Sequence, residues 1–271
     1  MSLVSGWRSW LGRVHDARNG SVRTRGTEKL LSFIEPRMWR FRYLGDYYYA
    51  LRQGWLDIFA DTSAIYADLH RQHGLPTIVA HWGATPRWYK DLNLNRDIDV
   101  LWMGTRGTKR RSLLLDRVRD ELGAYKVRIH IADGKENPFI FGDERIRYLN
   151  RSKITLNLTR TWYDDNFSRL ALAAPNRSLT ISEPLLPHCP PLIAGTHYVS
   201  APVASLARTI VYYLEHEAER LRIVEDAYRL FTTQLTFRES IKSIMDAVNR
   251  VSQSVHSNHH RPLTDRYRLP G

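Results

Sequence analysis

The 271-residue sequence predicts an α/β fold in which parallel strands alternate with helices. Two observations support this class. A compact apolar run, Ile98–Met103, leads into a segment with apolar residues at helical spacing, Ser112–Leu122, and a second β-prone run, Val127–Ile131, follows. The same alternation then continues towards the C-terminus. Alternation of this kind is typical of βαβ units, which build a parallel sheet covered by helices.

The N-terminal third of the chain is predicted to be mostly helical. Apolar residues recur at three- and four-residue intervals through Tyr43–Ala60, which predicts one helix or two short ones broken near Gly54. A further helix is predicted over Ser63–His73, and a short strand over Thr77–His81. Residues 1–26 are rich in Arg, Gly and Ser and have only weak periodicity, which predicts a loosely ordered segment.

The predicted sheet continues with two β-prone runs, Ile154–Leu158 and Leu179–Ser182, the first of them preceded by a short helix at Tyr148 and Leu149. Later apolar periodicity predicts helices over Leu206–Leu214, Leu221–Phe231 and Ile241–Val251. The chain is therefore divided into a basic, loosely ordered segment (1–26), a short N-terminal lobe (27–96), a sheet-containing lobe (97–235), a C-terminal helix (236–252) and a disordered tail (253–271).

Composition narrows the function classes without choosing one. Lys and Arg number 40 against 28 Asp and Glu, a net charge of +12, so the protein should attract phosphate in a nucleotide, a nucleic acid or an anionic surface. No apolar run approaches the roughly 20 residues of a membrane-spanning helix, and the N-terminus has no signal-peptide pattern, which predicts a cytoplasmic protein. The single cysteine, Cys189, excludes an internal disulfide and a multi-cysteine zinc site.

A basic glycine turn follows the first strand of the predicted sheet. Gly104 and Gly107 allow a ligand to approach the backbone, and the helix that follows presents unpaired N–H groups. Arg106, Lys109 and Arg110 add charge-assisted donors, which indicates phosphate binding. The turn lacks the GxxxxGK[ST] and GxGxxG patterns, so a βα turn with solvated basic residues stays open as the alternative.

A second polar pair ends the strand predicted at Ile154–Leu158. Asn157 and Arg160 lie at or beyond its carboxyl end, where open α/β sheets bind ligands. Asn157 is a candidate hydrogen-bond partner of a ligand, and Arg160 is a candidate phosphate contact. Both side chains also fit the simpler role of terminating the strand.

Several segments, read in order, resemble one family. DIDVLWMG, RYLNRSKITLNLTR, RLALAAPNRSLTISE and LARTIVYYLEHEAERLRIVEDA resemble the spore-maturation (CgeB-like) branch of the GT-B glycosyltransferases, and YYYALRQGWLDIFADTSAIYADLHRQHGLP resembles the end of that family's N-terminal lobe. The resemblance runs from about Gly45 to about Met245. Order and spacing carry it, since no single motif is decisive.

The resemblance implies a GT-B-like fold: a Rossmann-like C-terminal lobe, a shortened, mostly helical N-terminal lobe, and a final helix that crosses back towards it. A nucleotide-diphosphate-sugar would bind as donor substrate, with no metal site and no further cofactor. The residues it places near the donor diphosphate are Gly104, Thr105, Arg106, Lys109 and Arg160. Those it places near the nucleoside or sugar are Asn157, Arg169 and Glu183.

The chain departs from this family where related enzymes read roughly R-x-F-E-A-x-x-x-G. Leu172 occupies the glutamate position and Arg177 the glycine position. Leucine cannot accept the hydrogen bond that a carboxylate accepts from a sugar or ribose hydroxyl. Asp164 is the candidate acidic group on the preceding loop, and His81 is the candidate catalytic base.

Three functions follow from these observations. The first is a glycosyltransferase that acts on an unknown acceptor, whether a glycan, a protein or a small molecule. The second is a degenerate, non-catalytic relative that binds a nucleotide or a partner protein, which Leu172, Arg177 and the short first lobe favour. The third is a nucleic-acid-binding protein, which the absence of a zinc-finger, RRM or recognition-helix motif disfavours.

Overall fold

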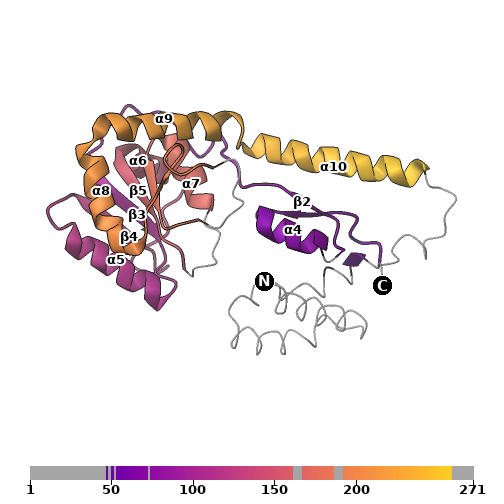
Figure 1. Cartoon of the computed structure of the whole chain (residues 1–271), viewed down its shortest axis with the longest axis horizontal. Coiled ribbons are helices and arrows are strands. Elements are labelled where there is room, and N and C mark those ends of the chain that lie inside the picture. The colour runs from indigo at the N-terminus through magenta and orange to yellow at the C-terminus, as the bar shows by residue number, and fades with distance from the viewer. Residues whose placement is uncertain are drawn as a thin grey trace. The chain divides into compact units, whose positions relative to one another are not determined.

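The computed structural model describes residues 47, 50, 51, 53–72, 74–160, 167–185 and 192–257. These residues belong to two compact units, which are considered separately (Figure 1). The larger unit is His81–Lys242, and the smaller one contains the described residues up to Ala80 and from Ser243 onwards. The last helix, α10 (Phe237–Ser257), contributes residues to both. The division of the chain into five segments, from the basic segment 1–26 to the tail 253–271, stays a prediction.

The smaller unit contains a β1–α4–β2 arrangement: β1 (Phe59–Asp61), α4 (Ala64–Gln72) and β2 (Thr77–Val79). The two strands are parallel, and Phe59 pairs with Thr77. The prediction of helix throughout Tyr43–Ala60 is therefore wrong at its end. Gly54 turns the chain with φ +70°, and the residues after it pair with β2, so strand pairing overrides the local helical spacing.

The larger unit is built on a five-stranded sheet with the order β4–β3–β5–β6–β7, and every neighbouring pair is parallel. The strands are β3 (Ile98–Gly104), β4 (Val127–Ile131), β5 (Ser152–Asn157), β6 (Leu179–Ser182) and β7 (Val199–Ser200). The first four match the runs predicted from the sequence, and the short β7 was not predicted. The chain moves from β3 to β4 on one side and returns to β5 on the other, so β3 and β5 flank a topological switch point.

Helices cover both faces of this sheet. They are α5 (Lys109–Glu121), α6 (Gly142–Arg151), α7 (Phe167–Ala173), α8 (Leu206–Glu215) and α9 (Glu217–Thr233). Val100 and Trp102 pack in one cluster with residues of α5, α8 and α9, whereas Leu101 packs with residues of α6 and α7. This alternation follows from the two-residue period of a strand. None of the helices in the described part of the chain is long and apolar enough to cross a membrane.

The chain segment that enters the larger unit packs backbone to backbone against the start of α10. The Ala84 amide donates to the Leu235 carbonyl over 2.8 Å, and the Phe237 amide donates to the Ala84 carbonyl over 2.8 Å. Gly83 lies so close to this segment that an added Cβ would be 2.1 Å from the Thr236 carbonyl carbon. Glycine is therefore required at position 83.

We expect Gly83→Ala to lower the free energy of unfolding by about 3 kcal/mol or more, because two backbone segments must separate to admit the methyl group. The matched control is Gly123→Ala, whose added Cβ would meet its nearest atom at 3.7 Å. Its stability should be unchanged or slightly raised. Urea denaturation measures both variants, and equal stability of the two would contradict the close backbone contact.

Candidate functional site

A pocket of about 370 Å³ opens at the carboxyl ends of the strands that flank the switch point. Its walls come from separate βα connections of the larger unit. They are the end of β3 (Met103, Gly104), the end of β4 (His130, Ala132), the segment 139–141, the α6 residues Arg145 and Leu149, Arg160 after β5, the α7 residues Ser168, Arg169 and Leu172, and also Arg111 and Thr155. This is the position at which open α/β sheets bind ligands.

Positive charge dominates the pocket. Its lining includes four arginines, Arg111, Arg145, Arg160 and Arg169, and no Asp or Glu among the described residues that form it. Guanidinium groups donate hydrogen bonds and accept none, and they match the geometry of phosphate oxygens. The pocket is therefore suited to an anionic ligand, phosphate in particular.

The end of β3 holds two of these arginines in place. Arg169 Nη1 donates to the Met103 carbonyl over 2.6 Å, and its guanidinium lies 4.9 Å from the centroid of the buried Trp102 ring. Arg111 Nη1 donates to the Thr105 carbonyl over 3.3 Å. Gly104 has φ +147°, and an added Cβ would lie 2.9 Å from Arg169 Nη2. Glycine at this position therefore lets the Arg169 guanidinium lie against the strand end.

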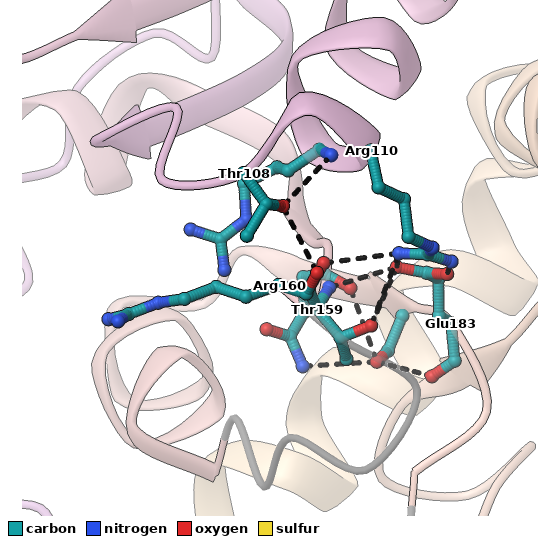
Figure 2. Close-up of polar contacts among 8 residues, drawn as sticks. Thr108, Arg110, Thr159, Arg160 and Glu183 are labelled. Atoms are coloured by element: carbon teal, nitrogen blue, oxygen red, sulfur yellow. Dashed lines mark hydrogen bonds and ion pairs between the residues drawn. The ribbon is translucent and has the colours of Figure 1, made fainter. Parts of the chain in front are cut away.

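A hydrogen-bonded network joins the start of α5 to the ends of β5 and β6 (Figure 2). Thr108 caps α5, and its Oγ1 donates to the Arg160 carbonyl over 3.1 Å. Arg110 forms an ion pair with Glu183. Glu183 Oε2 also accepts from the Thr159 amide over 2.9 Å and from Thr159 Oγ1 over 3.1 Å. The Glu183 carboxylate raises the pKa of Arg110 above its ordinary value through their hydrogen bond.

This network fixes the turn from which Arg160 projects. Figure 2 shows the Arg160 side chain extended away from the Arg110–Glu183 pair. The Thr108 hydroxyl positions Arg160 through its carbonyl, Glu183 holds the preceding residue Thr159, and Arg160 itself lines the pocket.

Residues 110–246, half of the chain, match the model of the glycosyl transferase-like family. The chain belongs to this family. No curated protein matches the sequence. The narrower resemblance to the CgeB-like branch stays a prediction.

Solved structures share the fold of this glycosyl transferase-like protein at low sequence identity. HepE from Anabaena, crystallised with UDP-glucose, has a TM-score of 0.57 and 10% identity, over 80% of this chain and 68% of the HepE chain. Sucrose-phosphate synthase from Thermosynechococcus elongatus has a TM-score of 0.55 and 11% identity, over 73% and 59% of the two chains. A glycosyltransferase from Rickettsia africae has a TM-score of 0.53 and 10% identity, over 83% and 80%. These similarities confirm the GT-B fold class.

Three of the residues predicted to bind the donor line the pocket at the β3/β5 switch point. Gly104, Arg160 and Arg169 all line it. Thr105 is not among the lining residues, but its carbonyl accepts a hydrogen bond from Arg111, which lines the pocket. These residues come from two separate βα connections and α7, and the parallel sheet brings them together.

Other predicted donor contacts lie outside the pocket lining. Arg106 donates to Ser112 and forms an ion pair with Asp116 at 3.1 Å, so it is held along α5. Lys109 is exposed at the first position of α5. Their contact with a diphosphate stays a prediction.

Asn157 and Glu183 are buried at the ends of neighbouring strands and do not line the pocket. Asn157 Nδ2 donates to Ser182 Oγ over 3.0 Å, whereas its buried Oδ1 has no hydrogen-bond partner among the described residues. The oxygens of Glu183 are occupied by Arg110 and Thr159. Their direct contact with a nucleoside or sugar also stays a prediction.

Of the two predicted catalytic residues, His81 belongs to the described part of the chain and Asp164 does not. The His81 ring packs against Phe167 with centroids 5.5 Å apart, and its carbonyl accepts a hydrogen bond from Ser240. Phe167 precedes the pocket residues Ser168 and Arg169 on α7, but His81 does not line the pocket. Asp164 lies outside the described residues, as does Cys189.

The two departures from the family pattern have different structural consequences. Leu172 lines the pocket, so it adds apolar surface there and no hydrogen-bond acceptor. Arg177 adopts φ +55°, a left-handed conformation that glycine tolerates best, which accounts for a glycine in the pattern. Arg177 also forms an ion pair with Glu225 at 2.7 Å and lies 3.7 Å from the Tyr228 ring centroid. These contacts offset the backbone strain.

Several residues that line the pocket were not predicted from the sequence: Arg111, Arg145, His130, Phe139 and Phe141. Arg111 adjoins the predicted basic turn and could have been included with it. The other residues lie at the end of β4, in the β4–α6 connection and at the start of α6, a stretch with no recognisable motif. No local signal in the sequence identifies them.

We expect Glu183→Gln to destabilise the protein by about 2 kcal/mol, because the buried Thr159 donors and Arg110 lose their charged acceptor. Glu121→Gln is the matched control, since Glu121 pairs with Arg117 on the surface. The control should change stability by no more than about 0.5 kcal/mol. Urea denaturation at neutral pH compares them, and a Glu183→Gln variant as stable as wild type would refute a structural role for this network.

Proposed function

We propose that this protein is a glycosyltransferase that transfers a sugar from a nucleotide-diphosphate-sugar to a glycan, protein or small-molecule acceptor in the cytoplasm. The observation that carries the proposal is the cationic pocket at the β3/β5 switch point, with four arginines and no acidic side chain among its described lining residues. Such a pocket provides the donors that a diphosphate requires.

The proposed chemistry depends on charge that develops when the bond between the sugar and the diphosphate breaks. Negative charge then accumulates on the leaving diphosphate, and fixed donors stabilise it most where they are already oriented. Arg169 is oriented by the Met103 carbonyl and the Trp102 ring, and Arg160 is positioned by its turn. His81 is the proposed base for the acceptor hydroxyl, and Asp164 is the proposed acidic group.

Relatives of known structure support the donor class. HepE was crystallised with UDP-glucose, and the pneumococcal O-GlcNAc transferase GtfA, with a TM-score of 0.54 and 11% identity over 76% of this chain and 47% of its own, was crystallised with UDP and GlcNAc. This chain spans about two thirds of the HepE chain. A nucleotide-linked sugar is therefore the ligand that the fold and the pocket charge favour together.

Leu172 favours a second candidate function, a non-catalytic relative that binds the nucleotide but does not transfer the sugar. It lines the pocket at the position where the family resemblance leads to a glutamate. Without that acceptor, hydrogen bonds to the sugar are lost, which weakens orientation of the reacting carbon.

We expect Arg160→Ala to raise the Kd for UDP by about tenfold or more, because it removes one charge-assisted donor from the pocket. The matched control is Arg117→Ala on α5, whose guanidinium pairs with Glu121 on the surface. It should bind UDP as the wild type does. Isothermal titration calorimetry at fixed ionic strength measures both. Equal loss in the two variants would point to general charge, and no loss in either would remove Arg160 from the site.

We expect the wild-type protein to release UDP, GDP or TDP from at least one corresponding nucleotide-sugar, and Arg160→Ala to lower this rate by at least about tenfold. Thermal-shift screening selects the donors that bind, and a coupled nucleotide-release assay measures turnover. Binding without turnover for every donor would support the non-catalytic relative. The absence of binding to any donor would overturn both candidates.

A further inference from the structure

Large apolar side chains are exposed at the start of α10 and on the chain segment that packs against it. Trp82 is 49% exposed, Phe237 is 46% exposed and Ile241 is 43% exposed. All three residues belong to the larger unit. Apolar surface of this kind is unfavourable in water, and where several large side chains gather it commonly indicates a surface that binds a partner.

Backbone contacts hold Trp82 beside the first turn of α10. The Phe237 amide donates to the Ala84 carbonyl over 2.8 Å, and the close approach of Gly83 to the same helix start joins the two segments. The Trp82 ring stacks on the Trp88 ring, with centroids 5.9 Å apart and an interplanar angle of 21°. The stacking orients an aromatic side chain that remains half exposed.

The sequence of α10 places its exposed apolar residues on one face. Phe237 and Ile241 are separated by about one helical turn, so they lie one above the other. Met245 and Val248 continue this spacing along the helix and are also exposed, whereas Ala247 is buried. The apolar face of α10 is therefore wider than the part that packs against the rest of the protein.

Unpaired cations border this apolar face. Arg238 and Lys242 directly follow Phe237 and Ile241, which places each about 100° further round the helix. Both are exposed, as is Arg87 in the segment beside α10, and none of the three cations forms an ion pair with a described residue. Long basic side chains can cover apolar surface with their stems while their charged ends reach an anionic group.

The acidic residues of α10 lie on its other side. Glu239 and Asp246 are about 200° and about 180° round the helix from Phe237. Thr236 Oγ1 accepts a hydrogen bond from the Glu239 amide over 3.2 Å, so Glu239 belongs to the capped start of the helix. The exposed apolar face is therefore bordered by positive charge and kept apart from the negative charge of the same helix.

The combination of apolar and cationic side chains selects the partner. A nucleic acid would complement the cations, but it offers no hydrocarbon for the exposed phenylalanine and isoleucine. An anionic lipid surface supplies both, because its headgroups carry phosphate and its acyl chains lie directly beneath them. Tryptophan is enriched at this boundary, where its ring meets both environments.

The α10 patch is defined here as the exposed apolar residues and the cations that border them: Trp82, Phe237, Ile241, Arg87, Arg238 and Lys242. We propose that the α10 patch binds the surface of an anionic membrane. Its apolar side chains lie at the boundary between headgroups and acyl chains, and its cations bind headgroup phosphates. The patch lies outside the pocket lining, so this inference does not depend on the proposed function.

Co-sedimentation of the full chain with vesicles tests the proposal, using phosphatidylcholine alone and an equimolar mixture with phosphatidylglycerol. The wild-type protein should bind the anionic vesicles at least about tenfold more tightly, because each cation near the surface adds attraction. Phe237→Ser combined with Ile241→Ser should weaken this binding by about tenfold or more, since two inserted apolar side chains are lost. Arg238→Gln combined with Lys242→Gln should weaken it to a similar extent, about tenfold, and reduce its dependence on salt.

Two double variants elsewhere on the larger unit are matched controls. Leu113→Ser with Leu221→Ser removes exposed leucines from α5 and α9. Arg147→Gln with Arg208→Gln removes exposed arginines from α6 and α8 and changes the net charge as the α10 pair does. Both controls should bind anionic vesicles within about threefold of the wild type. Urea denaturation establishes that each variant is folded.

Equal binding of the wild-type protein to neutral and anionic vesicles would overturn the proposal, as would the absence of binding to both. A loss in the control variants as large as that in the α10 variants would also overturn it, because general charge or apolar surface would then explain the binding. Light scattering could instead show a dimer that Phe237→Ser with Ile241→Ser converts to a monomer, without vesicle binding. That outcome would replace the membrane with a second copy of the chain.

Discussion

The described pocket at the carboxyl ends of the parallel strands brings several arginines together, and the surrounding structure must offset their mutual repulsion. Four guanidinium groups from different parts of the chain line one pocket, and no described carboxylate separates them. Their mutual repulsion is offset where backbone carbonyls and the Trp102 ring face them, as for Arg169 and Arg111. Arg145 Nε is buried without a hydrogen-bond partner among the described residues, so a bound anion would stabilise this guanidinium.

The end of β3 shows how the backbone serves this arrangement. Gly104 removes the side chain that would meet the Arg169 guanidinium, and Trp102, fully buried, presents its ring to the same group. On the neighbouring strand, buried Glu183 organises Thr159 and so fixes the turn of Arg160. One acidic residue near the site is thus used to position a turn, outside the pocket lining, and the positive potential of the pocket is preserved.

The two departures from the family pattern have different effects: Arg177 affects the backbone, and Leu172 affects the pocket lining. Arg177 occupies a left-handed backbone position, and Glu225 and Tyr228 hold its side chain away from the pocket lining, so its effect is structural. Leu172 faces the pocket and alters what a ligand can donate to it. With Leu172 at this position, the described lining of the pocket offers arginine donors and no carboxylate acceptor.

The sequence by itself determined the strands β3 to β6, the glycine turn after β3 and the candidacy of Arg160 and Arg169. The spacing of apolar residues and the turn glycines are local features, so they can be recognised from neighbouring residues. Arg160 follows a predicted strand, and Arg169 was assigned through the family resemblance. Only the tertiary structure decided that Phe59–Asp61 is a strand, since its partner Thr77–Val79 is distant in sequence. It also placed Arg111 in the pocket and Arg106 along α5, because the phase of the helix start selects which side chain turns inwards. Arg145 reaches the site through a separate βα connection, and only the order of strands in the sheet brings that connection beside β3.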